Sequence, residues 1–132
     1  LAEDMQKGVA LTASDKVKDY LRLYFSRQSH ESFVVLFLDV GNKLIACTEM
    51  FRGTLSHTSV YPREVVKAAL ACNAASVIFA HNHPSGTVKP SQADKTLTHL
   101  LRQALGLVDI RVLDHVIVAG NETFSFAEHG LM

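Results

Sequence analysis

The sequence predicts an α/β (α+β) fold in which helices flank a mixed β-sheet. Two hydrophobic patterns alternate along the chain. Short apolar runs rich in β-forming residues, such as 33–40 and 76–80, are typical of buried strands, whereas apolar residues at helical spacing indicate a helix over 91–105. A length of 132 residues with 48% hydrophobic residues suits one globular domain with its own core. We therefore expect a loose N-terminal lead-in over residues 1–13 and a single domain over residues 14–132.

The first half of the chain is expected to supply two helices and three antiparallel strands. Ser14 followed by Asp15 is typical of a helix N-cap with an acidic first turn, and apolar residues at helical spacing continue to about Arg27. Gly41-Asn42 between two apolar runs indicates a hairpin turn. Pro62 is favourable at the first position of a helix. The expected elements are a helix over 14–27, strands over 33–40, 44–50 and 53–60, and a helix that begins at Pro62 and buries residues 65, 66, 69 and 70.

The second half of the chain is expected to place a helix between strands. The strand 76–80 is followed by the helix 91–105, which turns its leucines inward. Two late strands are expected over 110–113 and 116–119, then a turn at Gly120-Asn121 and a short strand or edge over 124–126.

Two histidines follow the strand 76–80 directly and are candidate metal ligands. In an extended chain, residues two positions apart point to the same side, so His81 and His83 can direct both imidazoles at one point. Pro84 favours the extended conformation at His83. Asp94, on the first turn of the next helix, can fold back as a third ligand. Two imidazole nitrogens and one carboxylate form a three-ligand zinc set that leaves the fourth position for water.

The segment Ser91-Gln92-Ala93-Asp94 also has a second interpretation. It is an S-x-x-D pattern at a helix start, which is typical of a capping box. On that interpretation Ser91 and Asp94 only satisfy backbone donors and bind no metal. The two histidines ahead of the segment favour the metal site.

These motifs resemble known families. His-x-His, seven residues, Ser, two residues and Asp form the JAMM (MPN+) metalloprotease signature, present here as His81, His83, Ser91 and Asp94. The string HNHPSG, with VYPREVVKAAL upstream and LDHVIVAG downstream, resembles the bacterial RadC family from Leu11 to the C-terminus. The resemblance implies a JAMM/MPN-like fold with cytidine-deaminase-like layering. It also implies Zn²⁺ as cofactor and a metallopeptidase- or isopeptidase-like hydrolase.

The resemblance further implies catalytic roles for two residues. Zinc lowers the pKa of bound water from ~16 to about 7, and a carboxylate outside the ligand set can then act as general base. JAMM enzymes use a glutamate beside an early strand, and the matching position is Glu31, with Glu49 and Glu64 as competitors. The serine that matches Ser91 helps to stabilise the oxyanion in those enzymes.

Several other polar residues keep two interpretations. His115 follows Asp114 in the LDHVIVAG string; it could lie behind the metal ligands, but a structural bond to Asp114 is favoured. Arg63 and Lys67 share a helix side, where a solvated face is the default and a phosphate contact the alternative. Asn82 and Ser85 could orient substrate or stabilise the turn, while surface or cap positions are expected for His30, His57, His99 and His129.

Three function classes follow from the sequence. The first is a zinc hydrolase acting on a peptide or protein substrate. The second is a DNA-repair-associated role, because RadC proteins have been called DNA repair proteins; 13 basic and 13 acidic residues give a net charge of +0, which supports direct nucleic-acid binding only weakly. The third is a non-catalytic interaction module, against which the intact ligand set speaks. Two distant cysteines, no secretory pattern and no membrane-length apolar run predict a cytoplasmic protein without a membrane partner, and the oligomeric state stays open.

Overall fold

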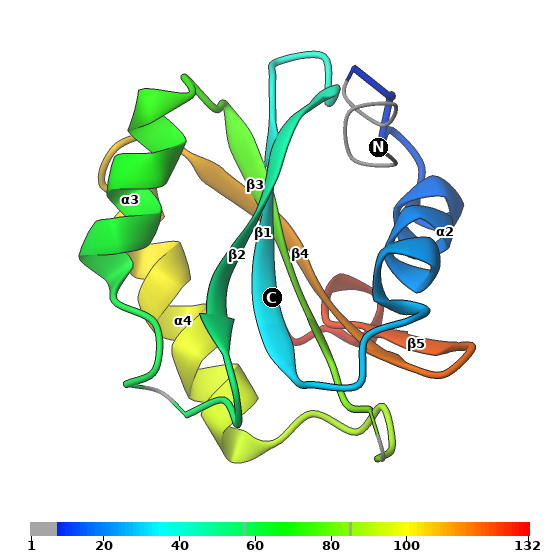
Figure 1. The fold of residues 1–132 in the computed structure, drawn as a ribbon. Coiled ribbons are helices and arrows are strands. Elements are labelled where there is room, and N and C mark those ends of the chain that lie inside the picture. Colours follow the sequence, from blue (N-terminus) through cyan, green and yellow to red (C-terminus); the bar gives the residue numbers. More distant parts are fainter. Residues whose placement is uncertain (1–7, 57, 85) are drawn as a thin grey trace.

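The computed structural model describes residues 8–56, 58–84 and 86–132, which form one five-stranded sheet with helices on both faces (Figure 1). The strand order is β2-β1-β3-β4-β5. The helices are α2 (Ser14–Phe25), α3 (Pro62–Ala71) and α4 (Gln92–Gly106), and the short 3₁₀ helix is η1 (Ala127–His129). The strands are β1 (Ser32–Leu38), β2 (Leu44–Arg52), β3 (Ser76–Asn82), β4 (Arg111–Ala119) and β5 (Glu122–Ser125). None of the described helices is long and apolar enough to cross a membrane.

The sheet is mixed, which confirms the predicted fold class. Strand β1 pairs antiparallel with both β2 and β3, and β4 pairs antiparallel with β5. Strands β3 and β4 are parallel, so the chain needs a crossover between them, and α4 provides it. As a consequence the end of β3 and the start of α4 lie at the same end of the sheet, as Figure 1 shows.

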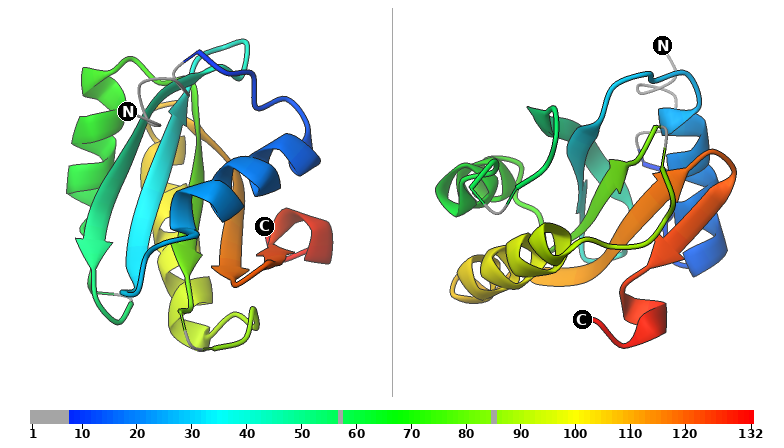
Figure 2. Two further views of the ribbon diagram at one scale, coloured as in Figure 1. Left: turned by 45° about the vertical axis from the view of Figure 1, so that its right-hand side comes forward. Right: turned by 90° about the horizontal axis from the view of Figure 1, so that it is seen from below.

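Each face of the sheet has its own hydrophobic core. Figure 2 shows α2 on one face and α3 with α4 on the other. Strand β1 is buried along its whole length because its side chains alternate between the two cores: Val34, Leu36 and Leu38 pack toward α2, and Phe33, Val35 and Phe37 pack toward α3 and α4. This two-sided burial explains the uninterrupted apolar run in the sequence.

The predicted strand over residues 53–60 is wrong. Strand β2 ends at Arg52, and Gly53 follows with φ 123°, a left-handed conformation that breaks the strand. The described residues beyond it form turns, in which the Ser56 N–H donates to Ser59 Oγ at 2.8 Å. Leu55 and Val60 are nevertheless buried against the α3–α4 core, so their hydrophobicity anchors a loop.

Smaller boundaries also differ from the predictions: β1 ends at Leu38 rather than at residue 40, and β2 and β3 each run two residues further than expected, to Arg52 and Asn82. Helix α2 has Ala13 rather than Ser14 at its N-cap, because the Ser14 hydroxyl instead donates to Glu128 at 2.6 Å; the helix ends at Phe25. The two late strands are one strand, β4. Strand β5 ends at Ser125, before Phe126.

Part of the segment expected to be a loose lead-in runs beside the β1–β2 hairpin. Ala10 forms a β-bridge with Lys43, and the Leu11 N–H donates to the Asn42 carbonyl at 2.9 Å. The Leu11 side chain packs into the α2 core. Residues 1–7 of the lead-in lie outside the described residues.

Candidate metal centre

The three predicted ligands converge where β3 ends and α4 begins. His81 Nε2 lies 2.9 Å from His83 Nε2 and 3.2 Å from Asp94 Oδ1. His83 Nε2 lies 3.8 Å from Asp94 Oδ2. His81 and Asp94 are almost fully buried, whereas His83 is partly exposed. The structure therefore brings His81, His83 and Asp94 to one point at the rim of the sheet.

The backbone after β3 explains why both imidazoles face the same way. The His83 N–H donates to the Val118 carbonyl at 2.9 Å, which continues the pairing of β3 with β4 for one further residue. His83 therefore stays extended, two positions after His81. Its Nδ1 lies 2.6 Å from the Thr87 carbonyl oxygen. A carbonyl only accepts, so this Nδ1 carries the hydrogen and the His83 Nε2 lone pair faces His81 and Asp94.

The capping box predicted for Ser91 and Asp94 is also present. Ser91 Oγ accepts the Asp94 N–H at 3.0 Å, and Asp94 Oδ2 accepts the Ser91 N–H at 2.8 Å. This capping leaves Asp94 Oδ1 directed at His81. The capping and metal-binding interpretations are thus compatible, because the cap fixes the carboxylate in the position that a ligand would need.

The surroundings of Asp94 keep its carboxylate ionised. Burial on its own would raise the pKa, but the hydrogen bond and the charge attraction from His81, together with the Ser91 N–H, lower the pKa to about 2. Imidazole lone pairs beside a carboxylate anion form a donor set suited to a divalent cation such as zinc. The residues present therefore fit a metal ion.

Glu31 lies beside the two histidines. Phe33 pairs with His81 in the antiparallel β1–β3 register, so Glu31, two residues earlier, lies opposite His83. Glu31, His81 and His83 offer ligand atoms that all lie within 4.8 Å of one another. The two histidines therefore belong to two overlapping triads, one completed by Asp94 and the other by Glu31.

Asn82 holds the backbone on both sides of Glu31. Its Oδ1 accepts the Ser32 N–H, and its Nδ2 donates to the His30 carbonyl, each at 2.9 Å. Asn82 itself is buried. This clamp uses the residue between the two histidines to fix the position of the glutamate. The sequence is compatible with substrate orientation or turn stabilisation by Asn82 but does not predict the clamp, because nothing local links positions 30–32 to 82.

The competing glutamates are engaged elsewhere. Glu49 Oε2 accepts from Arg52 at 3.2 Å, and Glu49 Oε1 lies 3.5 Å from His30 Nε2. Glu64 lies 3.7 Å from Arg63 and 3.9 Å from Lys67 on an exposed face of α3. These ion pairs agree with the solvated-face interpretation of α3.

Two further histidines among the described residues have clear ring contacts. His129 Nδ1 lies 2.9 Å from the Ser125 carbonyl oxygen and stacks on Phe124. His57 and Ser85 lie outside the described residues. The second is His115: its backbone N–H is bonded to Asp114 at 2.7 Å, but its ring contacts His81. The favoured bond to Asp114 therefore involves only the backbone.

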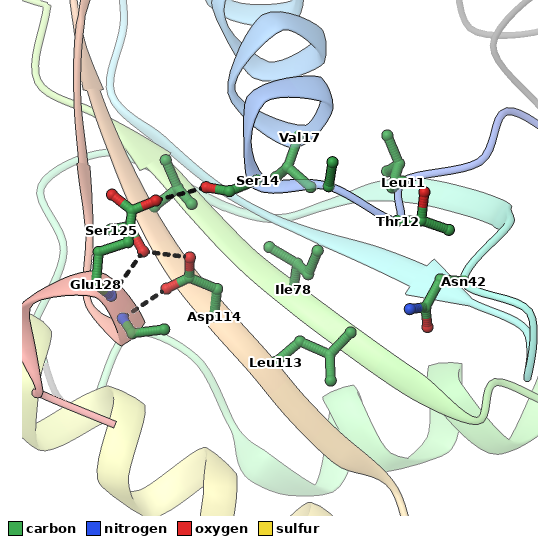
Figure 3. Close-up of a pocket in the computed structure, with 13 residues that line it drawn as sticks. Leu11, Thr12, Ser14, Val17, Asn42, Ile78, Leu113, Asp114, Ser125 and Glu128 are labelled. Atoms are coloured by element: carbon green, nitrogen blue, oxygen red, sulfur yellow. Dashed lines mark hydrogen bonds between the residues drawn. The ribbon is translucent and has the colours of Figure 1, made fainter.

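Two cavities differ in what they offer a ligand. A cavity of about 220 Å³ adjoins the metal centre and includes Arg22, Asn82 and His83 in its lining. A cavity of about 240 Å³ lies beneath the start of α2 (Figure 3). Its carboxylates are already used: Asp114 accepts from Ser125 Oγ and the Ala127 N–H, and Glu128 accepts from Ser14. Of these two cavities, the first combines space with groups that could bind a ligand.

Comparison with known proteins agrees with the resemblance seen in the sequence. The RadC-like JAB domain matches residues 11–131. The chain is 66% identical to a UPF0758 protein of Herminiimonas arsenicoxydans over 130 residues, which are 98% of this chain and 58% of that relative. With the same coverage it is 61% identical to a UPF0758 protein of Janthinobacterium sp. and 60% identical to one of Thiobacillus denitrificans. The chain therefore spans about 58% of the length of these curated relatives.

Proposed function

The chain belongs to the family of RadC-like JAB domains, and from this membership we propose that it is a cytoplasmic zinc-dependent hydrolase that cleaves an amide or isopeptide bond in a peptide or protein. The observation that carries the proposal is the convergence of two imidazole nitrogens and the Asp94 carboxylate at the rim of the sheet, with Glu31 beside them. The chain spans 58% of the length of a curated relative, so the substrate of the whole protein is also part of the proposal.

We assign His81, His83 and Asp94 as the residues that hold the metal. Asp94 is preferred to Glu31 as the third ligand because its carboxylate is buried, ionised and fixed by the capping box. Glu31 is half-buried, and its carboxylate is held only through the backbone clamp. When bound, zinc supplies a Lewis acid that polarises the carbonyl and makes hydroxide available near neutral pH.

The remaining steps belong to Glu31 and Ser91. The Glu31 carboxylate accepts the proton of the attacking water and delivers it to the departing amine, which is the work of a general base and then a general acid. Ser91 Oγ accepts the Asp94 N–H, so its own hydroxyl hydrogen is directed elsewhere and is available to the oxyanion of the tetrahedral intermediate.

Metal content tests the centre on which the proposal depends. The purified chain should bind about one zinc ion, as measured by elemental analysis after purification without chelator and reloading with zinc. A His129→Ala variant is the matched control, since His129 is bonded to Ser125 and should leave the zinc content unchanged. A panel of peptides and isopeptides then tests hydrolysis. A chain that takes up no zinc after reloading would contradict the proposal.

A further inference from the structure

A chain of hydrogen bonds connects His81 to α4 behind the metal centre. His81 Nδ1 lies 2.8 Å from His115 Nε2, and His115 Nδ1 lies 2.5 Å from Thr98 Oγ1. The Thr98 hydroxyl donates to the Asp94 carbonyl oxygen at 2.7 Å. Two of the proposed ligands, one on β3 and one on α4, are therefore joined by side chains that are not ligands themselves.

The direction of these bonds follows from the hydrogens available. The single hydroxyl hydrogen of Thr98 goes to the Asp94 carbonyl, so Thr98 Oγ1 can only accept from His115. His115 Nδ1 then carries the hydrogen of its neutral ring, and His115 Nε2 must accept. The hydrogen between the two rings accordingly belongs to His81 Nδ1. In the neutral His81 ring the lone pair is then on Nε2, the nitrogen that faces His83 and Asp94 and would bind the metal.

The surroundings of His115 hold its ring in place. The ring is fully buried and stacks on Phe126, with ring centroids 4.5 Å apart. Phe33 and Phe79 meet it edge-on at 5.8 and 6.0 Å. These contacts fix the plane of the imidazole, so that both nitrogens stay aligned with their partners.

We propose that His115 and Thr98 are positioning residues of the metal centre, which hold His81 in the tautomer that exposes Nε2 and keep its ring in register with Asp94. The inference rests on the metal site of the proposed function. Its chemical reason is that a ligating imidazole needs its second nitrogen to carry the hydrogen and to have an acceptor. Here His115 is the acceptor for His81, and Thr98, one turn after Asp94, sets the orientation of the His115 ring.

Four substitutions and a packing control test the inference in the full chain. His115→Phe fills the aromatic site but removes the acceptor, whereas His115→Gln restores an acceptor near the position of Nε2. Thr98→Val removes the hydroxyl, and Thr98→Ser keeps it. Phe37→Leu disturbs the packing of the α3–α4 core at a residue that is not among the ring contacts of His115, so it is the matched control.

Two readouts are measured for each variant. The first is zinc affinity by chelator competition, where His115→Phe should lose ~10–100-fold, as is typical when the partner of a ligating histidine is removed. Thr98→Val should also bind more weakly, while His115→Gln and Thr98→Ser recover most of the loss. Phe37→Leu should unfold at lower denaturant but keep its affinity. The second readout is the tautomer of the neutral His81 ring from its ¹⁵N shifts in the metal-free chain, which should show the hydrogen on Nδ1 in the parent and a mixture in His115→Phe.

The outcomes distinguish this inference from the proposed function. If His115→Phe and Thr98→Val bind zinc as tightly as the parent, the positioning role is wrong and the metal site stands. Should His115→Phe fail to fold, the zinc affinity of Thr98→Val and the His81 tautomer in the parent still test the positioning role. A parent with the hydrogen on His81 Nε2 overturns the inference even if the chain is active. A parent that binds no zinc overturns both.

Discussion

Substitution of Ser91 by alanine and of Asp94 by asparagine should separate the capping role from the metal-binding role of the residues before α4. The two residues exchange reciprocal bonds, 3.0 Å from the Asp94 N–H to Ser91 Oγ and 2.8 Å from the Ser91 N–H to Asp94 Oδ2. Alanine at position 91 removes only the first bond. Asparagine at position 94 keeps an oxygen for the second bond but removes the negative charge.

The size of the Ser91→Ala effect follows from the bond it breaks. Loss of an N-cap serine costs about 1 kcal/mol in the free energy of unfolding. In a domain of this length, that cost corresponds to a decrease of ~3–5 °C in the melting temperature. Zinc affinity should change little, because the Ser91 backbone N–H still holds Asp94 Oδ2. Hydrolysis should fall separately, through loss of the oxyanion donor.

The Asp94→Asn substitution should differ from Ser91→Ala in its effect on zinc. The carboxylate has a pKa of about 2 in the folded chain, because His81 and the Ser91 N–H outweigh the cost of burial, so the substitution removes a full negative charge at neutral pH. Zinc affinity should therefore fall by more than the ~10–100-fold that is typical when a group supporting a ligand is lost. The melting temperature of the metal-free chain should also fall, because the lowered pKa means that the folded chain favours the charged carboxylate over a neutral group.

Both effects can be measured on the same preparations. Thermal unfolding of the metal-free chain reports stability, and chelator competition reports the metal. If Asp94→Asn binds zinc as tightly as the parent, Asp94 is only a capping residue and the ligand assignment is wrong. If Ser91→Ala loses zinc as fully as Asp94→Asn, the two roles cannot be separated as argued.

Three further predictions concern the ligands, the base and nucleic acid. His83→Ala should abolish zinc binding but leave a folded domain by circular dichroism, because His83 follows β3 and lies outside both hydrophobic cores; a collapsed fold would make the metal structural. Glu31→Gln should keep zinc and lose ~10²–10⁴-fold in hydrolysis, while Glu49→Gln and Glu64→Gln lose much less; the reverse order would refute the base assignment. DNA binding should be weak or absent in a titration at ~0.15 M salt, because a net charge of +0 offers few phosphate contacts; a submicromolar complex would support the repair-associated role.

Local patterns in the sequence predicted the fold class and the side chains that meet at the rim of the sheet, because both leave a signal in neighbouring residues. The alternation of buried strands with helices indicated the mixed architecture, and His81 and His83 needed only the geometry of an extended segment to point together. Asp94 was found through its place on the first turn of α4. In each case the determining interaction spans a few residues, or a motif with fixed spacing.

The errors arose where distant residues decide the conformation. The expected gap between strands 110–113 and 116–119 is absent: the Asp114 carboxylate accepts from Ser125 Oγ and the Ala127 N–H, and β4 continues through this residue. Leu55 and Val60 are apolar residues of the kind found in strands. Gly53 nevertheless ends β2, and the two side chains anchor a loop against the core.

The hydrogen-bonded link from His81 through His115 to Thr98 was not predicted for the same reason. It joins residues on β3, β4 and α4, and no spacing in the sequence predicts such a contact.

Asn82 offers a way to test whether the position of Glu31 matters as much as its charge. The residue holds the backbone at Ser32 and His30 but is neither a proposed ligand nor a proposed base. Asn82→Ala leaves the buried Ser32 N–H without its partner and should cost about 1–3 kcal/mol in the free energy of unfolding. Zinc affinity should stay close to that of the parent, while hydrolysis falls because the Glu31 carboxylate is no longer held beside the histidines.

A double substitution makes this argument quantitative. If Asn82 acts only through Glu31, then adding Asn82→Ala to Glu31→Gln should cost no further hydrolytic activity, since the group that it positions has already been removed. Asn82→Asp is the matched variant: it keeps an acceptor for the Ser32 N–H but sets a buried carboxylate oxygen against the His30 carbonyl oxygen, so it should lose at least as much as alanine. Losses that multiply in the double variant would mean that Asn82 affects hydrolysis by another route, and the clamp would then be a feature of the fold rather than of the reaction.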